Sequence, residues 1–383
     1  MRGTFCALLV AIAGISVAAS GASAATSVAG QARYAIDSAA RTADYTGTAA
    51  RNRFVILHEW ERDRMLALKA ADPRVTVLMY KNLGFMMERD QWGNASTGVS
   101  MQEAEQRPEW YLLDTDGRRF TSWSYDYIYA ADVGSASYQR RWADNVIAKL
   151  QAQGWDGVFM DDTNPTMRHH YTVGDVAKYP SDALYGAATG AAVAYIGDRV
   201  RGAGKLIVPN FGSWRDYRGV VDGWLDHVSG GMEEFFTKWG NTADVGYLTG
   251  GDWDRNLGAL EAAEAKRKYF LGVSHAPSGD AAAARYGWAT TLLGAGGRAA
   301  FALHADYTNE SRFPEYDYDI GEPTSARTRD AGGIHRRAFS NGLVLVNPTT
   351  TARTAALGGT YSGSGLTGVT SVTMAPHSGL ILT

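Results

Sequence analysis

The sequence predicts an α/β fold, a TIM (β/α)8 barrel followed by a small C-terminal all-β domain. Three observations support this prediction. Short apolar runs alternate with segments of helical periodicity. The alternation occurs eight times, over about the 250 residues that such a barrel needs. After about Asp330 helix formers become rare, and Thr, Ser, Gly and Val take over, which is typical of short strands. A doubly wound sheet is the alternative, but it usually carries a Gly-rich phosphate loop, which the sequence lacks.

Residues 1–25 have the pattern of a secretory signal peptide. Arg2 precedes an apolar run that is too short to span a bilayer. Small residues end the segment at Ala22-Ser23-Ala24, so we expect cleavage near Ala24. Cys6, the only cysteine in the sequence, would leave with the signal, and the mature chain would have neither a disulfide nor a cysteine nucleophile. We therefore expect a secreted protein, extracellular or periplasmic, with no membrane partner.

The composition favours a carbohydrate ligand. The formal net charge of −3 gives no electrostatic reason to expect nucleic acid as a partner. Aromatic residues make up 11% of the chain, and many of the 11 Trp and 20 Tyr lie beside predicted strand ends. Sugar rings present apolar C–H faces that stack on such side chains, although roughly half of these aromatics are expected in the core. The composition makes no prediction of the oligomeric state.

The predicted barrel strands are short apolar runs, and polar residues follow each of them. They span residues 54–57, 75–80, 127–131, 157–162, 206–209, 227–232, 269–273 and 299–303. Helices are predicted at 61–71, 137–153 and 181–200, and Gly154 is expected to end the second of them in the left-handed conformation. Residues from about 85 to 123 form a long excursion from this pattern.

The central stretch runs from Gly154 to Asn164 and reads G-W-D-G-V-F-M-D-D-T-N. Val158-Phe159-Met160 has the character of a parallel strand that is buried on both faces. Asp161 and Asp162 follow directly, at the strand end where α/β barrels place their chemistry. The alternative is structural, with one Asp capping the next loop and the other solvated.

A second acidic doublet, Glu233 and Glu234, follows the sixth predicted strand. Two carboxyl groups that flank a glycosidic bond are the minimum set for its hydrolysis. One member of each doublet should face the barrel mouth, because successive strand residues point to opposite sides. We prefer Asp161 and Glu234. Phe235 and Phe236 favour the Glu as the protonated acid, with Asp161 as nucleophile or base.

Other strand-end side chains are candidates for substrate binding. The polar candidates are Lys81, Asn82, Asp132, Asn210, His275 and His304. The candidates for stacking on a sugar are Trp60, Tyr80, Trp123 and Trp253. For each polar residue the alternative is a loop cap or a satisfied surface group, and for each aromatic it is the core.

The predicted domains are a catalytic barrel over residues 26–330 and a small β-sandwich-like domain over 331–383. Ser340-Asn341-Gly342 is a hairpin turn signal between Phe339 and the run Leu343–Val346. Residues 369–374 and 379–382 are further short strands. The small domain would stabilise or position the barrel, since nothing in it has a catalytic pattern.

Several motifs together resemble a known family. They are Trp110–Gly117, Asp156–Asp161, Gly230–Phe235, Asn341–Pro348 and Pro376–Leu382. In combination they resemble the glycosyl-hydrolase-like family 15, whose barrels are related to those of endo-α-1,4-polygalactosaminidases. The resemblance covers most of the mature chain. It implies a TIM-barrel glycosidase, retaining or inverting, with Asp161 and the strand-six Glu as catalytic residues; Asp162 and Glu233 leave the choice within each doublet open.

Two other functions are alternatives to a glycosidase. A metal-dependent polysaccharide deacetylase could use Asp161 and Asp162 with His169-His170 or His275 as ligands. The sequence has no His-x-x-x-His pair on one helix face, however, and adjacent His residues point apart. A non-catalytic barrel that only binds glycans is the other alternative. The preferred interpretation is a secreted glycoside hydrolase that acts on a polysaccharide or oligosaccharide and needs no metal or cofactor.

Overall fold

The computed structural model describes most of the chain after residue 27. The described ranges are 28–34, 44–87, 90–91, 94–121, 127–168, 175–212, 214–240, 242–243, 245–305 and 312–383. The predicted signal peptide with Cys6, the stacking candidate Trp123, and His169 and His170 lie outside these ranges. Among the helices described, none is both long and apolar enough to cross a membrane.

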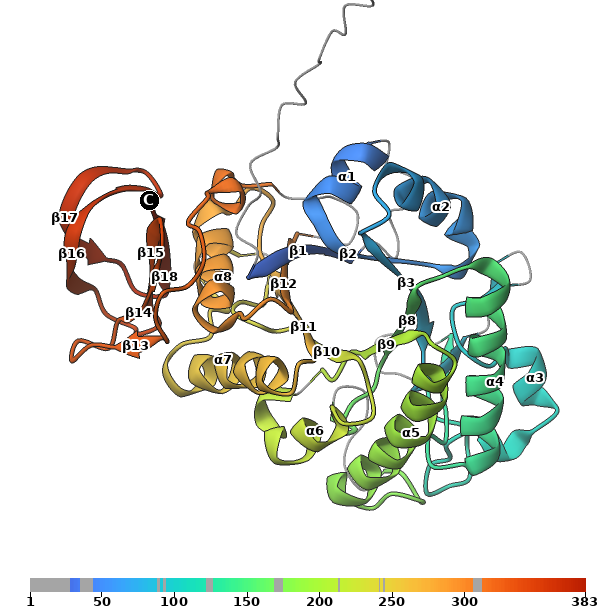
Figure 1. The fold of residues 1–383 in the computed structure, drawn as a ribbon. Helices are drawn as coiled ribbons and strands as arrows, with labels where there is room; N and C mark the ends of the chain where they lie inside the picture. The colour runs from blue at the N-terminus through green and yellow to red at the C-terminus, as the bar shows by residue number, and fades with distance from the viewer. Residues whose placement is uncertain are drawn as a thin grey trace, which may run out of the picture.

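Eight parallel strands form the barrel, so the predicted fold class is confirmed (Figure 1). They are β1 (Ala29–Tyr34), β2 (Asn52–Leu57), β3 (Thr76–Asn82), β8 (Gly157–Asp161), β9 (Leu206–Pro209), β10 (Gly230–Glu233), β11 (Tyr269–His275) and β12 (Ala299–His304). The order along the sheet is β10-β11-β12-β1-β2-β3-β8-β9. A parallel bridge between Asn210 and Met232 joins the two edge strands, and the sheet thereby closes on itself.

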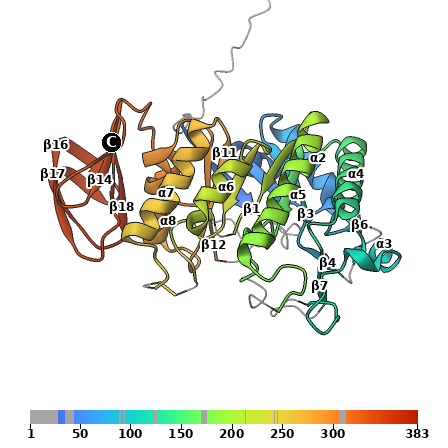
Figure 2. The ribbon, with the colours of Figure 1, turned by 90° about the horizontal axis from the view of Figure 1, so that it is seen from below.

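Two of the strand predictions need correction. The predicted strand at 127–131 is β7 (Ile128–Ala130), which pairs antiparallel with β4 (Phe85–Met87) outside the barrel. A parallel barrel strand there would need a crossover helix after β3, and that excursion holds only the short α3 (Met101–Glu105) among its described helices of the α type. The barrel strand that the sequence analysis missed is β1, the first in the chain. Its sequence Ala-Gly-Gln-Ala-Arg-Tyr contains no apolar run. Figure 2 shows β4 and β7 below the barrel strands.

Helices surround the barrel on its outer side (Figure 1). They are α1 (Tyr45–Arg51), α2 (Arg62–Ala71), α4 (Ala136–Gln153), α5 (Asp182–Gly202), α6 (Arg218–Trp224), α7 (Gly250–Ala265) and α8 (Ala281–Gly294). Short 3-10 turns are η2 (Glu59–Glu61), η3 (Pro108–Trp110), η4 (Trp214–Asp216) and η5 (Pro314–Asp317). The three predicted helices correspond to α2, α4 and α5. Gly154 ends α4 at φ 85°, which confirms the predicted left-handed cap.

Strand alternation divides the core into a barrel interior and a layer between strands and helices. The interior cluster is built from Ala32, Phe54, Ile56, Leu78, Tyr80, Phe159, Val208, Met232, Leu271, Val273, Ala300 and Ala302. The residues between them, such as Val158 and Met160, pack outward against the helices. The next inward position on each strand, toward its carboxyl end, therefore opens onto the mouth of the barrel.

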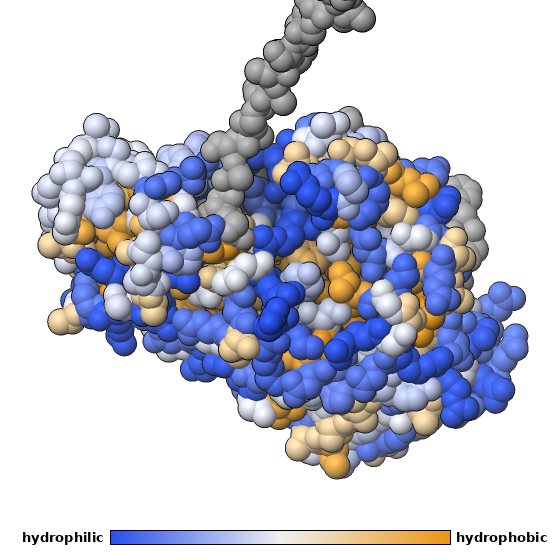
Figure 3. Space-filling model, in the orientation of Figure 1, coloured by the Kyte–Doolittle hydropathy of each residue, from blue (hydrophilic) through white to orange (hydrophobic). Residues whose placement is uncertain are grey.

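The C-terminal part of the chain forms two antiparallel sheets. One holds β13 (Thr328–Arg329), β14 (His335–Phe339), β15 (Gly342–Asn347) and β18 (Ser378–Leu382); the other is a hairpin of β16 (Arg353–Gly363) and β17 (Leu366–Met374). The hairpin region is pale in Figure 3 because Thr, Ser and Gly dominate it.

The four-stranded sheet packs directly on α8. A Cβ at Gly379 would lie 2.5 Å from the carbonyl oxygen of Arg285 on that helix. The guanidinium of Arg337 donates hydrogen bonds to the carbonyls of Leu292 and Ala295, 2.9 and 2.6 Å away, at the end of α8. Burial lowers the pKa of Arg337. These contacts attach the small domain firmly to the barrel.

Candidate active site

Polar side chains occupy the inward positions at the carboxyl ends of the barrel strands. On β8, Phe159 points inward, so Asp161 does too. After β10, Met232 points inward, so Glu234 follows on the inner side and Glu233 on the outer side. Tyr80 lies at the top of the interior cluster, and the inward positions above that cluster are His58, Asn82, Asp161, Asn210, Glu234, His275 and His304.

Asp161 and Glu234 share one hydrogen-bond donor. The side-chain nitrogen of Asn210, Nδ2, donates to Asp161 Oδ1 at 3.0 Å and to Glu234 Oε2 at 2.8 Å. The sum of these distances, about 5.8 Å, is the largest separation that the two carboxyl oxygens can have. Two acids that lie far apart in the sequence therefore come together at the barrel mouth.

The second oxygen of Asp161 is held by Tyr80. The Tyr80 hydroxyl donates to Asp161 Oδ2 at 2.7 Å. Burial, and then the charges of Asp161 and Asp162, raise the pKa of Tyr80, so the hydroxyl keeps its proton and remains a donor. Asp161 thus receives one hydrogen bond on each carboxyl oxygen, and these bonds fix the plane of its carboxyl group.

The acids at the mouth repel one another. Burial, followed by the charges of Asp162 and Glu234, raises the pKa of Asp161 to about 7, against the hydrogen bonds from Tyr80 and Asn210, which lower it. A cluster with this property retains a proton near neutral pH that an isolated carboxyl would have lost.

Asp162 lies beside the pair but is held separately. Its backbone is in the left-handed region, at φ 49°. Asn82 Nδ2 donates to Asp162 Oδ2 at 2.6 Å, and the amide oxygen of Asn82 accepts a hydrogen bond from the backbone N–H of Phe85 at 2.9 Å. Asn82 therefore anchors Asp162 to the loop after β3, and Asp162 acts on Asp161 through its charge.

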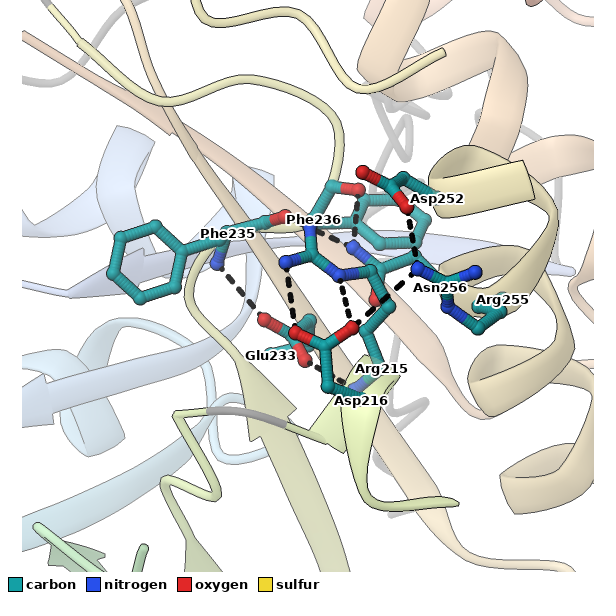
Figure 4. Close-up of polar contacts among 8 residues, drawn as sticks. All are labelled: Arg215, Asp216, Glu233, Phe235, Phe236, Asp252, Arg255 and Asn256. Carbon is teal, nitrogen blue, oxygen red and sulfur yellow. Dashed lines mark hydrogen bonds and ion pairs between the residues drawn. The ribbon is translucent and has the colours of Figure 1, made fainter. Parts of the chain in front are cut away.

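Glu233 is buried on the outer side of the barrel wall. Its carboxylate accepts hydrogen bonds from the backbone N–H groups of Arg215 and Phe235, both at 3.2 Å (Figure 4). Asn256 on α7 holds the same turn by donating to the carbonyls of Phe235 and Phe236. Burial raises the pKa of Glu233 to about 7. These contacts indicate a structural role for Glu233, which holds the turn after β10 in which Glu234 lies.

The raised pKa of Glu233 predicts a pH-dependent stability. The folded state binds the Glu233 proton up to about pH 7, whereas the unfolded chain loses it near the ordinary value of 4.5. The free energy of unfolding therefore falls as the pH rises between these values. Glu233→Gln removes this contribution, so the stability of the variant relative to wild type should increase from pH 5 to pH 8 by about 2 kcal/mol.

Urea unfolding at both pH values measures this change. Glu109→Gln, at an exposed acid on η3, is the control and should show no such trend. A difference between Glu233→Gln and wild type that stays constant with pH would contradict the burial argument.

Aromatic rings border the mouth on two sides. His275 Nε2 lies 3.6 Å from Glu234 Oε1, and the His275 ring meets Trp239 edge to face at 4.2 Å. On another side the ring of Trp60 stacks on His58 at 4.0 Å, and His58 lies 5.1 Å from Tyr80. His304 is buried, with its ring 6.5 Å from that of His275.

Three further candidates lie away from the acid pair. Asp132 is occupied by Lys178 and by the Tyr179 hydroxyl, which donates to it at 2.6 Å. Trp253 is fully buried between α7 and α8, where its indole N–H donates to Thr290. Lys81 points outward from β3 and pairs with the buried Glu59. The placements of Lys81 and Trp253 do not suit the substrate contacts predicted for them. The Lys81 side chain points away from the barrel mouth, and the Trp253 ring has no accessible face.

Lys81 and Glu59 line a hollow of about 420 Å³ on the outer side of the barrel wall, beside α4 and separate from the acid pair. Lys149, which is 41% exposed, also pairs with Glu59.

Replacing Lys81 by Met should lower the free energy of unfolding by about 3 kcal/mol, because the Glu59 carboxylate would remain buried without its buried partner. Lys149→Met should cost under about 1 kcal/mol.

Denaturant unfolding of Lys81→Met and Lys149→Met tests this ranking, and turnover per folded molecule should stay close to wild type in both. A stable Lys81→Met protein with weakened substrate binding would instead support the binding part predicted from the sequence.

Two residues at the mouth were not among the sequence candidates. His58 could have been found from the sequence. Phe54 and Ile56 point inward on β2, and because inward residues alternate with outward ones, position 58 is the next inward position. Trp239 lies in a loop, and no local pattern marks its position. Within the described residues, no group of three or more His, Cys, Asp and Glu side chains is arranged to hold a metal ion.

Comparisons with known proteins give one family match. The sequence model of the hypothetical glycosyl hydrolase family 15 matches residues 69–343. No curated protein matches the chain.

The fold is similar to those of several solved structures. The glycoside hydrolase domain of PelA from Pseudomonas aeruginosa is 15% identical, with a TM-score of 0.46, and the match covers 75% of this chain and 96% of that one. Ega3 of Aspergillus fumigatus, solved with galactosamine, is 11% identical, with a TM-score of 0.46 and coverages of 76% and 95%. The α-amylase AmyB of Thermotoga neapolitana is 10% identical, with a TM-score of 0.47 and coverages of 93% and 95%.

Proposed function

The chain belongs to the hypothetical glycosyl hydrolase family 15 and is a glycoside hydrolase, and from this premise we propose that Asp161 and Glu234 are the carboxyl pair that cleaves its substrate. The observation that carries the proposal is the Asn210 amide, which donates to both carboxyl groups at once. Hydrolysis of a glycosidic bond needs two such groups on either side of the bond.

The separation of the pair supports a retaining mechanism. Carboxyl groups lie about 5 to 5.5 Å apart in retaining enzymes and more than about 6.5 Å apart in inverting ones, which need room for a water molecule. The two oxygens that share the Asn210 amide, Asp161 Oδ1 and Glu234 Oε2, lie at most about 5.8 Å apart, and this short spacing is compatible with the retaining range. The pair therefore suits a double displacement through a covalent glycosyl–enzyme.

The hydrogen-bond donors support an assignment of the two roles. Asn210 donates to both carboxyl groups, but Tyr80 donates to Asp161 in addition, and this further hydrogen bond favours the ionised form of Asp161 as the nucleophile. Glu234 is the acid, and its side chain is 16% exposed, so it can exchange protons with water. A proton on Glu234 also removes one of the charges that raise the pKa of Asp161, so the two roles reinforce each other.

The reaction then proceeds in two steps. An Asp161 oxygen attacks the anomeric carbon while the bond to the leaving oxygen breaks, and Glu234 gives its proton to that oxygen. In the second step Glu234 takes a proton from water, whose oxygen attacks the anomeric carbon and displaces Asp161. The carboxyl pair ends in its starting protonation state.

The substrate that we propose is an exported polysaccharide or oligosaccharide. The signal-like segment at residues 1–25 and the aromatic rings around the mouth support this proposal. The test is a screen of polysaccharides for release of reducing ends by wild type and by Asp161→Asn, with and without a chelator. We expect release by wild type alone, and equal release in chelator. Release that the chelator abolishes would support a metal-dependent hydrolase instead.

A further inference from the structure

Trp239 is a large apolar side chain left in contact with water beside the acid pair. It is 44% exposed, whereas Phe236, Thr237 and Lys238, which precede it, are fully buried. Single exposed apolar residues are common on protein surfaces. The exposure of Trp239 alone therefore does not indicate a ligand.

Hydrogen bonds hold the backbone on both sides of Trp239. The buried ammonium of Lys238 donates to the carbonyls of Gly240 and Thr242 at 2.9 and 2.8 Å, inside the same loop. The backbone N–H of Trp239 donates to the carbonyl of Gly246 at 2.9 Å, and that of His275 donates to the carbonyl of Lys238 at 3.0 Å. The buried ammonium of Lys238 and these backbone hydrogen bonds thus anchor Trp239 and Lys238 to Gly246 and to β11, beside which the ring of Trp239 is exposed.

The neighbours of Trp239 direct it toward the chemistry. Its ring lies 4.1 Å from that of Phe235 and 4.2 Å from that of His275. His275 Nε2 is in turn 3.6 Å from Glu234 Oε1. A sugar ring that stacks on the open part of Trp239 would therefore lie next to Glu234, the group that gives its proton to the leaving oxygen.

Trp60 stands on the opposite wall. It follows β2, and Trp239 follows β10; three strands separate β2 from β10 in each direction around the closed barrel. Trp60 stacks on His58, whose ring lies 5.1 Å from Tyr80, the donor to Asp161. The acid pair therefore lies between two aromatic platforms, one on the Asp161 side and one on the Glu234 side.

We propose that Trp239 binds the sugar on the leaving-group side of the cleaved bond and that Trp60 binds a sugar on the other side. The inference rests on the proposed function, since the assignment of sides follows from the roles of Asp161 and Glu234. Sugar rings stack their C–H faces on aromatic side chains, and a side chain whose backbone is anchored loses less entropy on binding than a free one. The substrate is therefore a chain with at least one sugar on each side of the cleaved bond.

The test compares two substrates. The first is the polysaccharide that wild type cleaves fastest among starch, dextran, pullulan, xylan, chitosan and galactomannan. The second is the fluoride of the sugar found at the new reducing end, whose leaving group carries no ring. Trp239→Ala should lose about 10-fold or more in kcat/KM on the polysaccharide, mainly through KM, and keep wild-type kcat/KM on the fluoride.

Matched variants complete the test. Trp60→Ala should lose kcat/KM on both substrates, and Trp239→Phe should keep most of the wild-type value on the polysaccharide. Tyr195→Ala, at a 37% exposed aromatic on the outer helix α5, is the control and should match wild type. Equal losses of Trp239→Ala on both substrates, or no loss on the polysaccharide, would overturn the proposal.

The two proposals can fail separately. If Asp161→Asn and Glu234→Gln keep wild-type turnover while Trp239→Ala shows the expected loss on the polysaccharide, the carboxyl assignment fails and the platform stands. If the acid variants lose turnover and Trp239→Ala does not, the platform alone fails.

Discussion

Asp161→Asn lowers kcat by about 10³-fold or more, and the barrel stays folded. Asn keeps the shape of the side chain and removes the ionised oxygen that attacks the anomeric carbon. Glu234→Gln has an effect of similar size on a polysaccharide, because it removes the proton that the leaving oxygen needs. Reducing-end release at saturating substrate measures both losses, and thermal unfolding followed by circular dichroism checks that the fold is intact.

The substrate separates the two roles. Fluoride leaves without protonation, so Glu234→Gln should form the glycosyl–enzyme from a glycosyl fluoride far better than it cleaves a polysaccharide. Asp161→Asn should be equally impaired on both substrates, because each needs the nucleophile. The reverse pattern would exchange the roles of Asp161 and Glu234.

The other members of the two acid doublets are the controls. Glu233→Gln should keep turnover within about tenfold of wild type, since Glu233 contacts the backbone of the turn and not the mouth. Asp162→Asn should also keep turnover within about tenfold at neutral pH. If either control loses as much activity as Asp161→Asn, the inward-facing assignment is wrong.

Asn210→Ala lowers kcat by about 10²-fold and moves the pH profile. The Asn210 amide is the donor that Asp161 and Glu234 share, and its hydrogen bond lowers the pKa of Asp161. Without it that pKa rises further, so the acid limb of the profile, where Asp161 ionises, moves to higher pH.

The matched control for Asn210→Ala is Asn82→Ala, which removes the donor to Asp162. This change should leave the acid limb closer to its wild-type position. Profiles of kcat/KM between pH 4 and pH 9 measure both shifts. An Asn210→Ala profile that coincides with that of wild type would show that the shared amide does not control the protonation of the pair.

The inward direction of Asp161 could be predicted from the sequence because the residues before it in the strand are apolar. Val158-Phe159-Met160 leaves Asp161 as the first polar residue, and the alternation from Phe159 directs it inward. The same rule separates Tyr80 from Lys81. Both were predicted to bind substrate, yet adjacent residues on a strand face opposite ways, and only Tyr80 reaches the mouth.

Most of the features that the sequence analysis missed or placed differently are ones that local sequence does not encode. The buried residues of β1 include Ala29 and Ala32. Alanine does not have the large apolar side chain that marks a buried strand in a sequence. β7 has a strand-like sequence, but its partner β4 lies outside the barrel, and only tertiary pairing decides this. Trp253 had a usable signal, since Trp253, Leu257 and Leu260 recur at helical spacing on the buried face of α7. Trp239 had none, because its position depends on the Lys238 hydrogen bonds within the loop.

The most direct test of the paired carboxyl groups is the anomeric configuration of the first product. Proton NMR, recorded before the free sugar can mutarotate, distinguishes the two anomers. Carboxyl oxygens bridged by one amide, at most about 5.8 Å apart, are compatible with the closer spacing of the carboxyl groups in retaining enzymes. We expect a first product with the configuration of the cleaved bond. A first product with the opposite configuration would contradict the assignment of Asp161 as the nucleophile.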